Sequence, residues 1–190
     1  LPELHNVPLI LVALLLGAGL AWWSAGKVPM TGMPQMVALL NGFGGAASAF
    51  VAAAELWNKP VVARLVDAAG AATPAAVVAG RDLVPWTQFG IATALAGLIG
   101  AVTFWGSLVA FGKLEELPRF KQPWTDPNRH WISLGLAVAT LLLVAGVCVY
   151  PGSFLLFLLL IIAGSCLGIT LTLPIGGADM PVVICLLNSY

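Results

Sequence analysis

Two asparagines recur within a repeated segment, and their placement is the strongest sign of chemistry in this sequence. The segment reads "MPQMVALLNGF" from Met33 and "MPVVICLLNSY" from Met180, with Met, Pro, Leu, Leu and Asn in one register. Proline suits the first turn of a helix, because its missing N–H would have no partner there. The Asn follows close to two turns later, so Asn41 lies about 10 Å along the helix from Pro34 on nearly the same face. Asn188 has the same place in the second copy.

The composition places these helices in a lipid bilayer. Of the 190 residues, 60% are hydrophobic and 8% are charged, and the mean hydropathy is +1.00. A soluble domain carries about a quarter of its residues charged. A β-barrel is excluded because the run from Ser153 is apolar throughout and does not alternate. The net charge is zero with no basic tract, so nucleic acid is not an expected partner. The predicted fold is an all-α membrane protein, a polytopic bundle of transmembrane helices.

Six apolar segments are long or regular enough to be helices of this bundle. We predict them at 6–25, 34–57, 86–112, 131–150, 153–173, and from 180 to the end of the chain. The last one rises only about 18 Å, short of a bilayer core about 30 Å thick, so we expect it to continue beyond Tyr190. Pro151-Gly152 allows only a tight turn between the fourth and fifth segments. The Ala-rich stretch 67–80 is predicted to be a surface excursion.

The two asparagines have a structural and a functional interpretation. A carboxamide in hydrocarbon is costly unless it is hydrogen-bonded, and the structural alternative is a bond to a neighbouring helix. Two carboxamides at one depth on parallel helices favour a hydrated proton path, with Asn41 and Asn188 holding water. Ser48 on the face of Asn41, and Thr103 on the helix at 86–112, are added to this path. The alternative for the small residues around them, including Gly100 and others, is tight helix packing.

Asp179 directly precedes the second repeat. As a plain N-cap its carboxylate would accept backbone N–H bonds at the helix start. The functional alternative is a proton-accepting gate at the mouth of the path. The three cysteines lie in apolar runs without metal-like spacing, so they are interpreted as small buried hydrophobes and no metal site is predicted.

The distribution of basic residues predicts the orientation of the chain. One side of the predicted bundle collects five Lys and Arg residues and the other side three. The first set is Lys27, Lys113, Arg119, Lys121 and Arg129, and the second is Lys59, Arg64 and Arg81. Cytoplasmic loops carry the excess of positive charge. The loops around 27 and 113–130, and the turn at 173–179, are therefore predicted to be cytoplasmic.

Four stretches of the sequence closely resemble a known family. They are "MTGMPQMVALLNGFGGAAS", "GAVTFWGSLVAFGKL", "PNRH" and "GGADMPVVICLLNSY". They are similar to segments of the beta subunit of proton-translocating NAD(P) transhydrogenase. The resemblance implies an enzyme subunit of the inner cell membrane. In this family a membrane domain joins two soluble domains, and a proton crosses the membrane as hydride passes between NAD(H) and NADP(H).

The resemblance assigns residues 1–190 to part of the transmembrane domain, without a nucleotide-binding domain. It implies no catalytic hydride residues and no cofactor site in this chain, since both nucleotides bind to soluble domains of the complete enzyme. The implied partners are an alpha-type companion subunit with the NAD(H) domain and further membrane helices, and the chain's own C-terminal NADP(H) domain. A homodimer of the complex is also implied.

Three residues are carried over from the family's motifs. Asp179 in "GGADMP" matches a carboxylate that communicates with the NADP(H) domain, and Asn188 matches an Asn linked to proton conduction. Asn41 stands where some relatives have an ionisable His, and an amide does not take up a proton at physiological pH. The titrating group would then come from a companion subunit's helix, or water would bridge the gap.

Two other functions are compatible with the sequence. A small-solute or ion secondary transporter also uses repeated helices, although its repeats usually carry broken helices at mid-depth. An inert anchoring subunit would need neither asparagine.

Overall fold

The computed structural model describes residues 6–69, 86–120, 124–150 and 152–189, with the backbone alone for 58–69 and 86–88. These residues form six α-helices and two short 3-10 helices and no β-strand. The elements in chain order are α1 (Val7–Ala25), η1 (Met30–Gly32), α2 (Met33–Ala69), α4 (Trp86–Leu114), α5 (Arg129–Val149), α6 (Phe154–Thr172), η2 (Gly177–Asp179) and α7 (Met180–Asn188). Five helices are long and apolar enough to cross a membrane. The predicted polytopic bundle is confirmed.

The second helix is longer than the sequence analysis predicts. Its apolar span ends at Trp57, where we placed its end, but α2 continues to Ala69. The prediction was wrong because hydropathy falls at residue 58 while helix-forming Ala, Leu and Arg continue. Residues 67–69 of the predicted surface excursion therefore belong to α2, and 70–80 lie outside the described residues.

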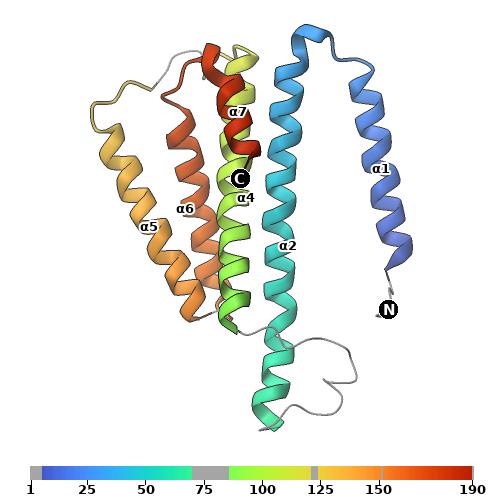
Figure 1. The fold of residues 1–190 in the computed structure, drawn as a ribbon, viewed down its shortest axis with the longest axis vertical. Helices are drawn as coiled ribbons and strands as arrows, with labels where there is room; N and C mark the ends of the chain where they lie inside the picture. The colour runs from blue at the N-terminus through green and yellow to red at the C-terminus, as the bar shows by residue number, and fades with distance from the viewer. Residues whose placement is uncertain (1–5, 70–85, 121–123, 151, 190) are drawn as a thin grey trace.

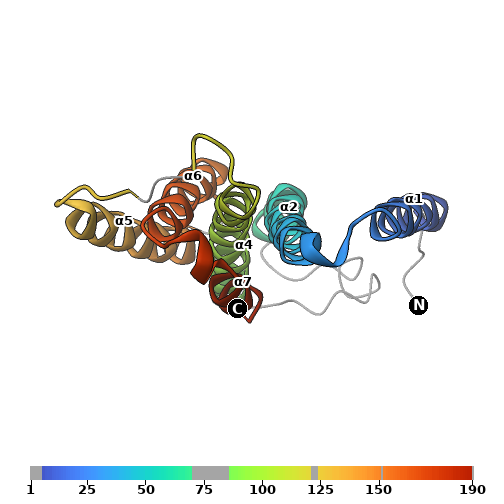
Figure 2. The ribbon, with the colours of Figure 1, turned by 90° about the horizontal axis from the view of Figure 1, so that it is seen from above.

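Helix α4 is the centre of the bundle. It packs against α2 on one side and against α5, α6 and α7 on the others, as Figures 1 and 2 show. Helix α1 stands apart from this group in both views, and none of its residues is buried. The connections after α1, α4 and α6 lie at one end of the bundle (Figure 1), so α2 and α7 start from the same end and run parallel.

Helices α5 and α6 form the predicted antiparallel hairpin (Figure 1). The backbone N–H of Ser153 donates to the carbonyl of Tyr150 at 3.0 Å, which closes the turn between them. The hydroxyl of Ser153 then accepts from the N–H of Leu156 at 3.4 Å. An N-cap of this kind satisfies one of the donors that the first helical turn leaves without an intrahelical partner.

Glycines set the distance between the helices. A Cβ on Gly100 would lie 2.5 Å from the carbonyl oxygen of Gly45, and one on Gly168 would lie 2.6 Å from that of Val102. The backbones of α2 and α4, and of α4 and α6, therefore touch directly. Close approach of this kind gives membrane helices dispersion contacts that apolar side chains alone do not supply. The tight packing predicted for the small residues is confirmed.

The repeat seen in the sequence extends into the local backbone. Each copy begins with a 3-10 helix, η1 or η2, directly followed by the α-helix that opens with Met-Pro. The residues before these turns have almost the same dihedral angles, with φ −68° and ψ 158° at Pro29 and φ −68° and ψ 155° at Gly176. Two segments with the same local structure thus enter the bundle from one end.

Replacing Gly100 with Ala should destabilise the bundle, because the new Cβ would overlap the backbone of α2. Overpacking of this kind costs about 1–3 kcal/mol, and we expect a lower unfolding temperature in detergent. Gly135→Ala is the matched control, since a Cβ at Gly135 meets nothing within 4 Å. Equal stability of the two variants would contradict a direct contact between the backbones.

Candidate functional site

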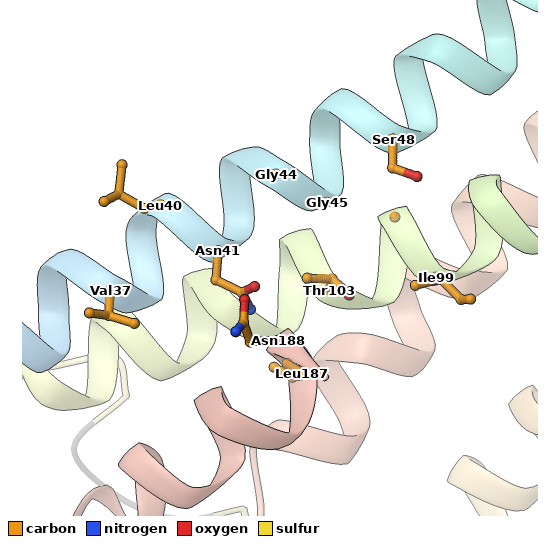
Figure 3. A pocket seen from close by; sticks show the side chains of 11 residues that line it. Val37, Leu40, Asn41, Gly44, Gly45, Ser48, Ile99, Thr103, Leu187 and Asn188 are labelled. Atoms are coloured by element: carbon orange, nitrogen blue, oxygen red, sulfur yellow. The ribbon is translucent and has the colours of Figure 1, made fainter. Parts of the chain in front are cut away.

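A mainly apolar groove that contains four polar side chains lies between α2, α4 and α7 at the level of the two asparagines. Its volume is about 460 Å³, and its lining consists of Val37, Leu40, Asn41, Gly44, Gly45, Ser48, Ile99, Gly100, Thr103, Leu187 and Asn188. The groove follows α2 over three turns, from one turn below Pro34 toward the middle of the apolar span Met30–Trp57. Figure 3 shows Asn41 and Asn188 with their carboxamides pointing toward one another.

Asn41 is held by a hydrogen bond to α4. Its Nδ2 donates to the hydroxyl oxygen of Ser107 at 3.0 Å, and Ser107 is completely buried. The adjacent Gly42 permits this contact, because a Cβ there would lie 3.2 Å from the Cβ of Ser107. The interhelical bond considered in the sequence analysis therefore exists at Asn41, and the same carboxamide also lines the groove. The two interpretations do not exclude each other.

Asn188 reaches the groove because α7 is seated on another glycine of α4. A Cβ on Gly106 would meet the Cδ1 of Leu187 and the hydroxyl of Thr172, each at 3.1 Å. Leu187 is buried against Gly106. The next residue, Asn188, is exposed and faces the groove (Figure 3). Its position at the end of α7 places it opposite Asn41, as the register of the repeat predicts.

The two hydroxyl residues predicted for the path differ in their surroundings. Thr103 is 5% exposed and lines the groove, and among the described residues its Oγ1 has no hydrogen-bond partner. A buried hydroxyl without a partner costs about 1–3 kcal/mol. A hydrogen-bonding molecule in the groove, such as water, would remove this cost. Ser48 also lines the groove, but its hydroxyl donates to the carbonyl of Ala96 on α4 at 3.3 Å. Ser48 therefore has a packing role as well.

Asp179 does not line the groove. The carboxylate lies at the exposed start of α7, and an apolar cluster separates this end from the asparagines. The cluster consists of the buried residues Ala38, Ala110, Met180 and Ile184. Met180, the residue after Asp179, is buried in this cluster between Ala38 of α2 and Ala110 of α4. The role of Asp179 as a gate at the mouth of the path stays a prediction.

The carboxylate of Asp179 also makes no capping bond to the start of α7. The 3-10 turn η2 precedes the helix, and the N–H of Asp179 already donates to the carbonyl of Gly176 at 3.2 Å. The plain N-cap interpretation is therefore not what the structure shows, and Asp179 faces solvent at the end of the bundle.

Two residues that the sequence analysis left out of the site bind helix ends near Asp179. Lys113, which was counted as a loop cation, is 6% exposed and donates to the carbonyls of Thr172, the last residue of α6, and of Leu173 and Ile175 after it. Gln35 donates through Nε2 to the carbonyl of Leu114 at 3.4 Å. The distribution of basic residues indicates on which side of the membrane Lys113 lies, but it does not show which carbonyls a long side chain can reach.

The site contains no group for metal or nucleotide chemistry. No cluster of three or more His, Cys, Asp or Glu exists among the described residues, and no ionisable side chain belongs to the groove lining. The glycines of "GFGGAAS" are in the interior of α2, and Gly45 is pressed against the carbonyl of Gly100, 2.8 Å from where a Cβ would be. A pyrophosphate would have no room there, so the residues do not fit a dinucleotide.

The fold and the groove define a class of protein, a polytopic helical membrane protein with a groove among its helices that holds a few polar side chains. The family of NAD(P) transhydrogenase beta subunits matches the chain over residues 2–190. Two curated proteins of Rhodospirillum rubrum, one of them from a specified strain, are both described as "NAD(P) transhydrogenase subunit beta". Each is 36% identical over 189 residues, which is 100% of this chain and 37% of the relative.

The chain belongs to the NAD(P) transhydrogenase beta subunit family. It spans little more than a third of the length of the curated relatives that it matches. The resemblance stated from the four sequence stretches is confirmed.

The bond between Asn41 and Ser107 should be measurable by a double-mutant cycle. Asn41→Leu, Ser107→Ala and the double variant are compared by their free energies of unfolding in detergent. Hydrogen bonds between membrane helices average about 0.6 kcal/mol, with a maximum of about 1.7 kcal/mol, and we expect a coupling energy in this range. A coupling energy of zero would show that the two side chains do not interact.

Proposed function

We propose that this chain forms the proton-conducting part of the membrane domain of an NAD(P) transhydrogenase. In the complete enzyme, proton movement across the inner cell membrane would be coupled to hydride transfer between NAD(H) and NADP(H) on soluble domains. The observation that supports this function best is the groove that Asn41 and Asn188 share. Polar side chains within membrane spans usually face a bundle interior or a wet cavity and mark ion pathways.

The groove would conduct through water. Neither carboxamide titrates at physiological pH, but each has donors and an acceptor that can orient water molecules. The Oγ1 of Thr103 supplies a further bonding position on the opposite wall. A proton would pass along hydrogen-bonded water between these groups. The titrating group would be a side chain of a companion alpha-type subunit beside the groove, or the water would continue to the membrane surface.

The apolar cluster around Met180 would act as the closed gate of this path. It separates the groove from the end of the bundle where Asp179 is exposed. Water crosses such a dry contact only when the helices move, so conduction would require α7 to shift against α2 and α4. Met180 is the first residue of α7 and directly follows Asp179, so a change at the carboxylate would be transmitted to the gate without an intermediate element.

Asp179 would then connect proton occupancy with the soluble domain. Its end of the bundle carries Lys27, Arg119 and Arg129 and is the predicted cytoplasmic side. We propose that the chain's C-terminal NADP(H) domain docks on this end, in a complex that forms a homodimer. Protonation of Asp179 and docking would shift one another by the same free energy, because linkage is reciprocal.

Replacing Asp179 with Asn in the complete enzyme should uncouple the two processes. The amide keeps the shape of the side chain but does not exchange a proton, so proton-coupled transhydrogenation in proteoliposomes should fall at least about tenfold. Hydride exchange between isolated soluble domains should not change. Glu115→Gln is the matched control, since Glu115 is an exposed carboxylate at the same end. Unchanged proton pumping in the Asp179 variant would remove this residue from the mechanism.

Replacing Asn41 and Asn188 with Leu should block proton movement. Leucine has the branching of asparagine at Cγ but is larger and has no polar atoms, so the groove would lose the groups that orient water. We expect proton uptake into proteoliposomes to fall to background. Normal pumping by the double variant would support an inert anchoring role, and solute uptake by vesicles that contain this chain alone would support a secondary transporter.

A further inference from the structure

The ammonium group of Lys113 is buried at the junction of three elements. Lys113 belongs to the last turn of α4 and is 6% exposed. Its Nζ donates to the carbonyl of Thr172 at 3.2 Å and also to the carbonyls of Leu173 and Ile175. These carbonyls belong to the end of α6 and to residues 173–176, which we call the connector and which lead into η2.

This arrangement satisfies the ammonium and the helix end at the same time. The last carbonyls of an α-helix have no intrahelical partners and carry the negative end of the helix dipole. A lysine ammonium has three N–H donors, and three carbonyls converge on it here. The carbonyls at the end of α6 are thus bound by a cation from α4. In other helices, water or a basic residue of the helix's own last turn binds these carbonyls.

The bound carbonyls link the starts of the two repeats. Gln35, in the first turn of α2, donates to the carbonyl of Leu114, the neighbour of Lys113 in α4. Lys113 then binds the connector, and the connector continues through η2 to Asp179 and α7. The start of α2 and the start of α7 are therefore joined through the last turn of α4 by hydrogen bonds from side chains to carbonyls.

A second cavity gives access to the ammonium. Its volume is about 390 Å³, and its lining consists of Lys113, Leu114, Glu116, Phe120, Ile175, Gly176, Gly177 and Ala178. It lies at the end of the bundle where Asp179 is exposed. Gly177, the first residue of η2, lies beside α4, since a Cβ there would be in ordinary contact with the carbonyl oxygen of Lys113, at 3.6 Å. Because Lys113 lines this cavity, we expect a small cation to enter the space that a shortened side chain at residue 113 would leave.

We propose that Lys113 is a positioning residue, whose tethered cation fixes the connector and thereby the place of Asp179 and α7 relative to the groove. The part of this inference that concerns coupling rests on the proposed function. Lys113 itself does not touch the groove lining, so its effect on protons would pass through the connector. Removing the ammonium takes one donor from each of the three carbonyls. Those of Thr172 and Leu173 keep the N–H groups of Ile175 and Trp124, each at 3.3 Å, so we expect the connector to loosen most at Ile175, next to the turn that carries Asp179.

The test is chemical rescue of Lys113→Ala in the complete enzyme. This variant lacks the propylammonium part of the side chain, and added n-propylammonium can enter through the second cavity. Without the amine, we expect amide hydrogen exchange in residues 173–179 to become at least about tenfold faster, the change that losing one charge-assisted hydrogen bond implies. The ratio of protons moved to hydride transferred should fall with it, and n-propylammonium should restore both values.

The controls distinguish the loss of the hydrogen bonds in Lys113→Ala from the loss of a positive charge and from a failure to fold. Propyltrimethylammonium has the same charge and stem but no N–H donors, and it should restore neither value. Lys27→Ala removes an exposed cation at the same end and should leave exchange in the connector unchanged. If Lys113→Ala does not assemble, Lys113→Met keeps the volume of the side chain, and faster exchange in its connector supports the inference.

Two outcomes would overturn the proposal. One is amide hydrogen exchange in the connector of the Lys113 variants at the same rate as in the unsubstituted protein. The other is equal rescue of Lys113→Ala by n-propylammonium and by propyltrimethylammonium. Fast exchange in Lys113→Ala together with full coupling in Asp179→Asn would have a different meaning. The Lys113 contact would then stand as a structural link, and the role of Asp179 in the proposed function would be wrong.

Discussion

The direct backbone contact between Gly45 of α2 and Gly100 of α4 is the constraint on which the rest of the site depends. Hydrocarbon gives no hydrophobic force that drives helices together, so their association needs close packing and hydrogen bonds. A Cβ on either glycine would lie within 3 Å of the other helix's backbone. This separation lets the carboxamide of Asn41 reach the hydroxyl of Ser107 across the interface. A wider interface would leave both groups buried without partners.

The same requirement that polar groups be satisfied shapes both ends of α7. At its start, the connector's carbonyls are bound by Lys113, and Met180 is buried in an apolar cluster. At its end, Asn188 faces a groove whose wall includes the hydroxyl of Thr103, which no other described residue hydrogen-bonds. The apolar cluster at Met180 and the groove at Asn188 are less than three turns apart along one short helix. A movement of α7 would therefore change both, which is the property that a gated path needs.

The repeat explains why two asparagines share the groove, and its differences explain why the two helices are not equivalent. Both copies begin with the same 3-10 turn and the same Met-Pro start. Gly32 stands in the first copy where Asp179 stands in the second, and Gln35 stands where the second copy has Val182. Only one copy thus presents a carboxylate at the end of the bundle. The other copy presents an amide that binds the end of α4.

The sequence by itself determined the all-helical membrane fold, the boundaries of most spans and the shared level of Asn41 and Asn188. These features follow from hydropathy and from register along single helices, which are local properties. Only the tertiary structure decided that Lys113 is buried, that Met180 packs between α2 and α4, and that Asp179 is not part of the groove lining. These features depend on which side chains of neighbouring helices meet. That choice follows from the glycine contacts between helix backbones, and periodicity within one segment carries no information about it.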